Sequence, residues 1–75
     1  MPKIKINYSW GDEEPPVKVP KDQDPWQFML DLALKELRIE CQEHCGEGEM
    51  KIIPEETGIE LHYHDGEICY YEMAD

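Results

Sequence analysis

The chain of 75 residues carries 7 Lys and Arg side chains against 18 Asp and Glu, a formal net charge of −11. This length accommodates a single domain over residues 1–75 and leaves little room for a deep enzyme cleft, so a binding role is favoured over catalysis. A strongly negative field repels phosphate backbones and anionic lipids, which argues against nucleic-acid and membrane partners. Residues 46–75 hold nine of the acidic side chains and a single basic one, so we expect the negative charge to concentrate there.

Cysteine usage and hydropathy predict a cytoplasmic protein. The three cysteines are an odd number for a disulfide framework, and the first ten residues lack the apolar stretch of a signal peptide. No run approaches the roughly 20 apolar residues that a membrane span needs. We therefore expect free thiols in a reducing compartment.

The first predicted elements are two strands joined by a turn. Residues 3–10 alternate strictly between polar and apolar, which is typical of a half-buried strand. The composition of residues 11–16 indicates a turn, and residues 17–19 read as a short second strand ended by Pro20. One face of the first strand carries Ile4, Ile6, Tyr8 and Trp10.

A helix is expected over residues 25–44. Asp24 and Gln27 form a capping box around Pro25 at the first helical position, and Gly46 suits the helix end. At 100° per residue, most apolar side chains share one sector that faces the core. That sector holds Trp26, Met29, Leu30, Ala33, Leu34, Leu37, Cys41, His44 and Cys45.

A second apolar stripe, formed by Phe28, Leu32 and Ile39, lies on nearly the opposite side of this helix. A helix over one face of a sheet can bury only one stripe fully. Either the loop at 11–16 or the segment after the helix covers the second stripe, or it is an exposed partner surface or homodimer seam.

Three further strands are expected at residues 50–53, 59–64 and 67–73. Asp65-Gly66 is a strong signal for a two-residue type I′ turn between the last two. That turn places Tyr63 opposite Ile68 and His62 opposite Cys69. The predicted inner face then carries Ile59, Leu61, Tyr63, Ile68 and Tyr70, and the outer face carries Glu60, His62, His64, Glu67, Cys69 and Tyr71.

The resulting order, ββαβββ, predicts an α+β fold with one mixed sheet and a single helix on one face. It resembles the ubiquitin-like β-grasp superfold in the order of its elements. That resemblance implies parallel pairing of the first and last strands at the sheet centre. Conjugating members of the superfold end in Gly-Gly, whereas this chain ends Met73-Ala74-Asp75, so a conjugation role is not expected.

Two sets of side chains are candidate zinc-type metal ligands. Cys41, His44 and Cys45 lie at i, i+3 and i+4 on one side of the expected helix, although the two cysteines equally extend its apolar stripe. His62, His64 and Cys69 share the predicted outer face of the last hairpin, where the histidines are equally well explained as solvent-exposed side chains. A Cys69–His62 nucleophile pair is disfavoured because the surrounding carboxylates raise a thiol pKa.

The sequence thus predicts no catalytic residues and no cofactor. The leading hypothesis is a small, acidic, non-enzymatic interaction module that binds a protein partner or a second copy through Phe28, Leu32 and Ile39. The alternative is a metal-binding domain that uses one of the two Cys/His sets.

Overall fold

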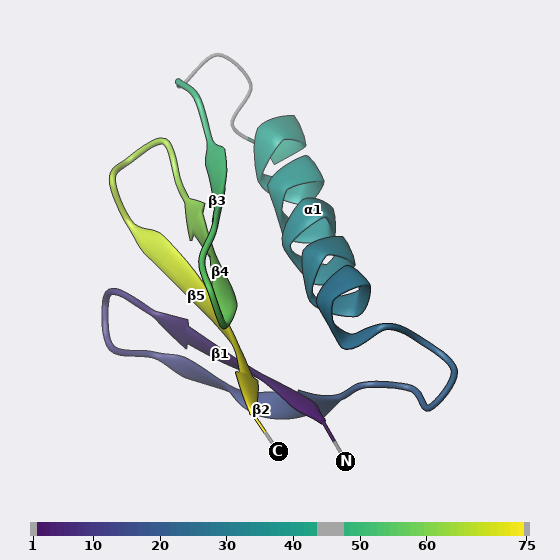
Figure 1. Cartoon of the computed structure of the whole chain (residues 1–75). Coiled ribbons are helices and arrows are strands. Elements are labelled where there is room, and N and C mark those ends of the chain that lie inside the picture. Colours follow the sequence, from purple (N-terminus) through teal and green to yellow (C-terminus); the bar gives the residue numbers. More distant parts are fainter. Residues whose placement is uncertain (1, 44–47, 75) are drawn as a thin grey trace.

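The computed structural model describes residues 2–43 and 48–74, in which one helix packs against one face of a five-stranded sheet (Figure 1). This confirms the α+β class and the predicted ββαβββ order. No helix in the described part of the chain is long and apolar enough to cross a membrane. The elements are β1 (Lys3–Tyr8), β2 (Glu13–Lys18), α1 (Pro25–Glu43), β3 (Lys51–Pro54), β4 (Gly58–His62) and β5 (Ile68–Ala74).

The sheet is antiparallel throughout, with strand order β2-β1-β5-β4-β3. The prediction of a mixed sheet with parallel first and last strands was therefore wrong. β5 lies beside β1 as expected, but it runs in the opposite direction, with Lys3 opposite Ala74 and Tyr8 opposite Cys69. The reason is that the chain reverses direction at each connection between successive elements, including the helix, which leaves β1 and β5 opposed (Figure 1).

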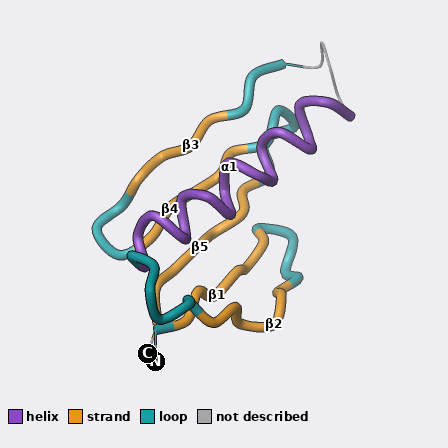
Figure 2. Tube along the Cα trace, turned by 90° about the vertical axis from the view of Figure 1, so that its right-hand side faces the viewer, coloured by secondary structure: helices purple, strands orange, loops and turns teal. Residues whose placement is uncertain are grey.

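The helix begins where its capping signal predicts. The Asp24 carboxylate accepts a hydrogen bond from the Gln27 backbone N–H at 2.9 Å, which satisfies one of the free N–H groups of the first turn. α1 lies over β4 and β5, whereas the β1–β2 hairpin extends to one side (Figure 2). The buried core between helix and sheet comprises Ile4, Val19, Met29, Ala33, Ile59, Leu61, Cys69 and Tyr71.

The β1–β2 hairpin is tighter than predicted. Three residues form the loop between Tyr8 and Asp12, and Gly11 adopts a φ of 101° that favours glycine. β2 therefore already begins at Glu13 and includes Pro15 and Pro16. Proline is tolerated there because β2 is an edge strand, and the pairing register with β1 shifts at this point.

The β4–β5 hairpin has the same loop design, which shifts its register by one residue from the prediction. Tyr63 N–H donates to the Glu67 carbonyl at 2.8 Å, and Gly66 has a φ of 91°. Asp65 does not have the positive φ that a type I′ turn needs, so that turn prediction was wrong. Leu61 now lies opposite Cys69, and His62 opposite Ile68.

The shift exchanges the two faces of β5. Cys69 and Tyr71 are buried under the helix, whereas Tyr70 is 38% exposed on the outer face. The predicted inward orientation of Ile59 and Leu61 is confirmed, because both are buried. The predicted inner face was wrong for Ile68 and Tyr70.

Candidate functional site

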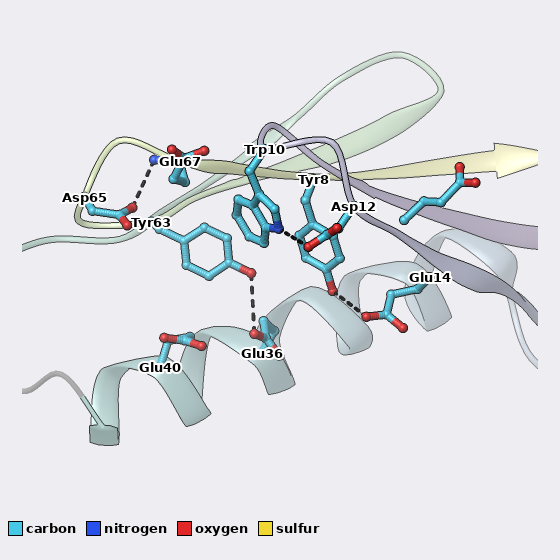
Figure 3. Close-up of a pocket in the computed structure, with 10 residues that line it drawn as sticks. Tyr8, Trp10, Asp12, Glu14, Glu36, Glu40, Tyr63, Asp65 and Glu67 are labelled. Atoms are coloured by element: carbon cyan, nitrogen blue, oxygen red, sulfur yellow. Dashed lines mark hydrogen bonds between the residues drawn. The ribbon is translucent and has the colours of Figure 1, made fainter.

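A cavity of about 460 Å³ opens at the end of the molecule where the two tight hairpin loops meet the second half of the helix. We call it the acidic–aromatic cavity because three aromatic and seven carboxylate side chains line it, and no basic side chain of the described residues does. It is lined by Tyr8, Trp10, Asp12, Glu13, Glu14, Glu36, Glu40, Tyr63, Asp65 and Glu67 (Figure 3).

The three aromatic rings form a row above the helix, with Trp10 between the two tyrosines (Figure 3). Tyr8 and Trp10 are stacked with ring centroids 4.5 Å apart. Tyr63 is tilted by 51° to Trp10 at a centroid separation of 6.0 Å. The indole N–H of Trp10 donates to the Asp12 carboxylate at 2.7 Å, which holds the ring in place although it is 48% exposed.

Hydrogen bonds from the tyrosine hydroxyls position two of the carboxylates. Tyr8 donates to Glu14 at 3.3 Å, and Tyr63 donates to Glu36 on the helix at 3.4 Å. Burial raises the pKa of both tyrosines, so the hydroxyls remain protonated donors. Glu14 and Glu36 therefore lie beside the tyrosine rings and accept hydrogen bonds from their hydroxyls. The described side chains that line the cavity include no positively charged group to balance these two carboxylates.

The Glu36 carboxylate lies in surroundings that disfavour a negative charge. Partial burial raises the pKa of its carboxyl above the ordinary value, and the neighbouring Glu40 carboxylate raises it further. A positively charged group in the cavity would relieve both effects. The cavity thus offers a cation two kinds of attraction, from carboxylates and from the electron-rich faces of aromatic rings.

The two hairpin loops are fixed to each other directly. The Ser9 hydroxyl donates to the Glu67 carboxylate and accepts from the Ile68 backbone N–H at 2.9 Å, while Ser9 N–H donates to the Ile68 carbonyl. Asp65 accepts a hydrogen bond from the Glu67 backbone N–H at 3.0 Å. These hydrogen bonds position the cavity walls that the two loops form.

Among the residues that the structure describes, the cavity carboxylates are not grouped as metal ligands. Within residues 2–43 and 48–74, no three Asp, Glu, His or Cys side chains are placed so that they could hold one ion. The cavity instead spreads its charge over a wide opening, which suits an extended organic cation such as a basic side chain.

The predicted metal set on the last hairpin is not brought together. His62 lies on the outer face and pairs with Glu60 at 2.9 Å, whereas Cys69 is buried on the helix side. The one-residue change of register separates them, and it also removes the Cys69–His62 pair. His64 belongs to the loop after β4.

Of the other predicted metal set, only Cys41 lies within the described residues. Its exposed thiol is 4.0 Å from the Met50 sulfur, at the end of the helix. His44 and Cys45 lie outside the described residues, so this prediction stays untested.

The second helical stripe divides into two parts. Phe28 and Leu32 are half-buried and pack against the core, whereas Ile39 is 41% exposed. Leu32 and Ile39 also line a groove beside the acidic–aromatic cavity, and Phe28 does not. As a partner surface, this stripe remains a prediction.

No protein-family model, curated protein or solved structure was found to match the chain. The function must therefore be inferred from the residues of the site itself.

The acidic–aromatic cavity is not evident in the sequence, because its residues come from three separate segments. The alternation of residues 3–10 correctly placed Tyr8 and Trp10 on one face of the first strand, and residues 12–14 are visibly acidic. What the sequence lacked was any sign that Glu36 and the loop at residues 64–66 would face them.

Proposed function

We propose that this domain is a non-enzymatic interaction module that binds a basic segment of a partner protein in the acidic–aromatic cavity. The observation that carries the proposal is the lining itself, in which seven carboxylates and three aromatic rings surround one opening and no described basic side chain joins them. Arg and Lys side chains are attracted to both kinds of group.

A separate partner fits this site better than a second copy of the chain. Each copy carries a net charge of −11, and two such cavities repel each other. Burial also raises the pKa of the Cys69 thiol to about 11, which disfavours a thiolate nucleophile at this position. Free thiols at Cys41 and Cys69 agree with action in the cytoplasm.

The first test is titration calorimetry of the domain with a blocked hexa-arginine peptide. Trp10→Ala should weaken binding about 5- to 30-fold, because it removes the ring at the centre of the aromatic row. Tyr70→Ala is the matched control, since Tyr70 is a similarly exposed aromatic side chain on the outer sheet face. It should change the affinity less than about 2-fold.

A charge-matched pair separates the cavity from the general negative field of the protein. Glu36→Gln and Glu72→Gln each remove one negative charge, but Glu72 is exposed on the outer face beside Lys5. Only Glu36→Gln should weaken binding by more than about 3-fold. Equal effects of the two variants, or of Trp10→Ala and Tyr70→Ala, would mean that the peptide follows the overall charge and that the proposal is wrong.

A further inference from the structure

An apolar groove of about 600 Å³ adjoins the acidic–aromatic cavity, between the helix and the β1–β2 hairpin. Leu32 and Ile39 line it from the helix, and Pro16 and Val17 line it from β2. The groove exists because α1 lies over β4 and β5, so the helix does not cover the inner side of the hairpin (Figure 2).

The groove and the cavity share a wall. Tyr8, Glu14 and Glu36 line both of them. The Tyr8 hydroxyl donates to Glu14 within this wall, so a hydrogen-bonded pair stands between the two compartments. The cavity and the groove therefore adjoin each other along this wall.

The two compartments differ in chemistry. Besides the shared wall, the cavity is lined by five further carboxylates. The groove is lined by the apolar side chains Leu32, Ile39 and Val17, and Lys35 is the single basic side chain among its described lining residues. A cation is therefore favoured in the cavity, and an apolar side chain is favoured in the groove.

We infer that one continuous partner segment occupies both compartments and presents a basic side chain to the cavity and an apolar side chain to the groove. This inference rests on the proposed function and adds the sequence pattern of the partner. Side chains two residues apart in a strand, or three to four apart in a helix, point the same way, so the two anchors lie two to four residues apart.

The occupant is a partner of basic amphipathic character, because the negative charge of the protein and of its cavity disfavours the other choices. A second copy would bring eleven net negative charges to a rim that already carries Glu14 and Glu36. A purely apolar segment would bring no positive charge to the carboxylates that line the cavity.

The test uses blocked nine-residue peptides with three arginines in a Gly/Ser background. One peptide has no apolar residue, and three others carry leucine two, three or four positions after the central arginine. At one of these spacings leucine should strengthen binding about 5- to 10-fold, which corresponds to partial burial of its side chain. Titration calorimetry measures each affinity.

Two isoleucines of similar exposure provide the matched variants. Ile39→Ser should abolish the gain from leucine while it leaves binding of the leucine-free peptide unchanged, because Ile39 lines only the groove. Ile53→Ser, at the outer sheet edge and 38% exposed, should leave the gain intact.

The outcomes distinguish the inference from the proposed function. If leucine gives no gain at any spacing, or if Ile53→Ser removes the gain as Ile39→Ser does, the two-compartment inference is wrong, while the binding of the leucine-free peptide still supports the proposed function. If no peptide binds, both are wrong.

Discussion

Glu36 is the residue at which stability and the proposed binding oppose each other. Its carboxylate is half-buried, accepts a hydrogen bond from Tyr63 and lies near Glu40. Partial burial and the Glu40 charge raise the pKa of the carboxyl from its ordinary value of 4.5, although the Tyr63 hydrogen bond lowers it, so the folded state holds the proton more tightly than the unfolded state does. Stability therefore falls as the pH rises from about 4.5 through the raised pKa, and the full penalty is present at neutral pH.

Glu36→Gln should stabilise the isolated domain at pH 7. Glutamine keeps an oxygen that can accept from Tyr63 and removes the charge. We expect a gain of a few tenths of a kcal/mol, because water screens a group that is only partly buried. The gain should shrink as the pH approaches 4, since the wild-type carboxyl is then largely protonated. Thermal denaturation at both pH values measures it.

Glu72→Gln is the control for this measurement, because Glu72 is exposed and lies opposite Lys5. It should give no comparable gain. A Glu36→Gln variant that is less stable than wild type at pH 7, or equally stabilised at pH 7 and pH 4, would contradict the account of this carboxylate.

At the scale of elements, the sequence predicted a strand well only where its alternation was clean. Residues 59–62 alternate between apolar and polar, and their buried positions were predicted correctly. The last strand reads Ile68-Cys69-Tyr70-Tyr71 without polar interruption, so its pattern does not indicate which residues face the core. Its orientation depended on the turn, and a loop one residue longer than predicted reversed it.

For the helix, too, one feature could be predicted from the sequence and another could not. Its start followed from local signals at Asp24 and Pro25, because a capping interaction involves only neighbouring residues. Whether the second stripe is covered could not be predicted from local signals, because the environment of Leu32 and Ile39 depends on the β1–β2 hairpin, which is distant in sequence.

The orientation of β5 can be tested through the Cys69 thiol. In a Cys41→Ser/Cys45→Ser variant, Cys69 is the only thiol, and the structure buries it completely. A thiol reagent at pH 8 should react at least about 100-fold more slowly with the folded domain than with the domain in denaturant, because reaction requires opening of the core. The raised pKa of about 11 slows it further.

Rapid labelling of the folded variant would contradict this register. It is the result expected if Cys69 faced outward opposite His62, as the type I′ turn predicted. A Tyr70→Cys substitution in the variant that also carries Cys69→Ser is the positive control, because Tyr70 is exposed on the outer face.

At the scale of the whole molecule, the candidate site is a consequence of the antiparallel sheet. Because β5 runs opposite to β1, the β1–β2 and β4–β5 loops lie at the same end, where Ser9 joins them to each other. Parallel pairing of these strands would have placed the loops at opposite ends. The cavity could therefore not be predicted from a sequence that indicates the order of elements but not their directions.

The fold also determines where the negative charge gathers. Along the sequence, acidic residues concentrate in the C-terminal third, but the cavity draws carboxylates from the first hairpin, the helix and the last hairpin. On the outer face, Lys5 lies opposite Glu72 across β1 and β5. The fold thus produces a local concentration of negative charge that the linear count does not show.

The most direct measurement of the central claim is an amide and indole ¹H–¹⁵N NMR titration with the blocked hexa-arginine peptide. Binding at the acidic–aromatic cavity predicts saturable shifts of the Trp10 indole N–H and of the amides of Tyr8, Glu36 and Tyr63, with little change at Lys5, Glu60 and Tyr70 on the outer face. Shifts that spread evenly over the molecule, or that concentrate on the outer face, would contradict it.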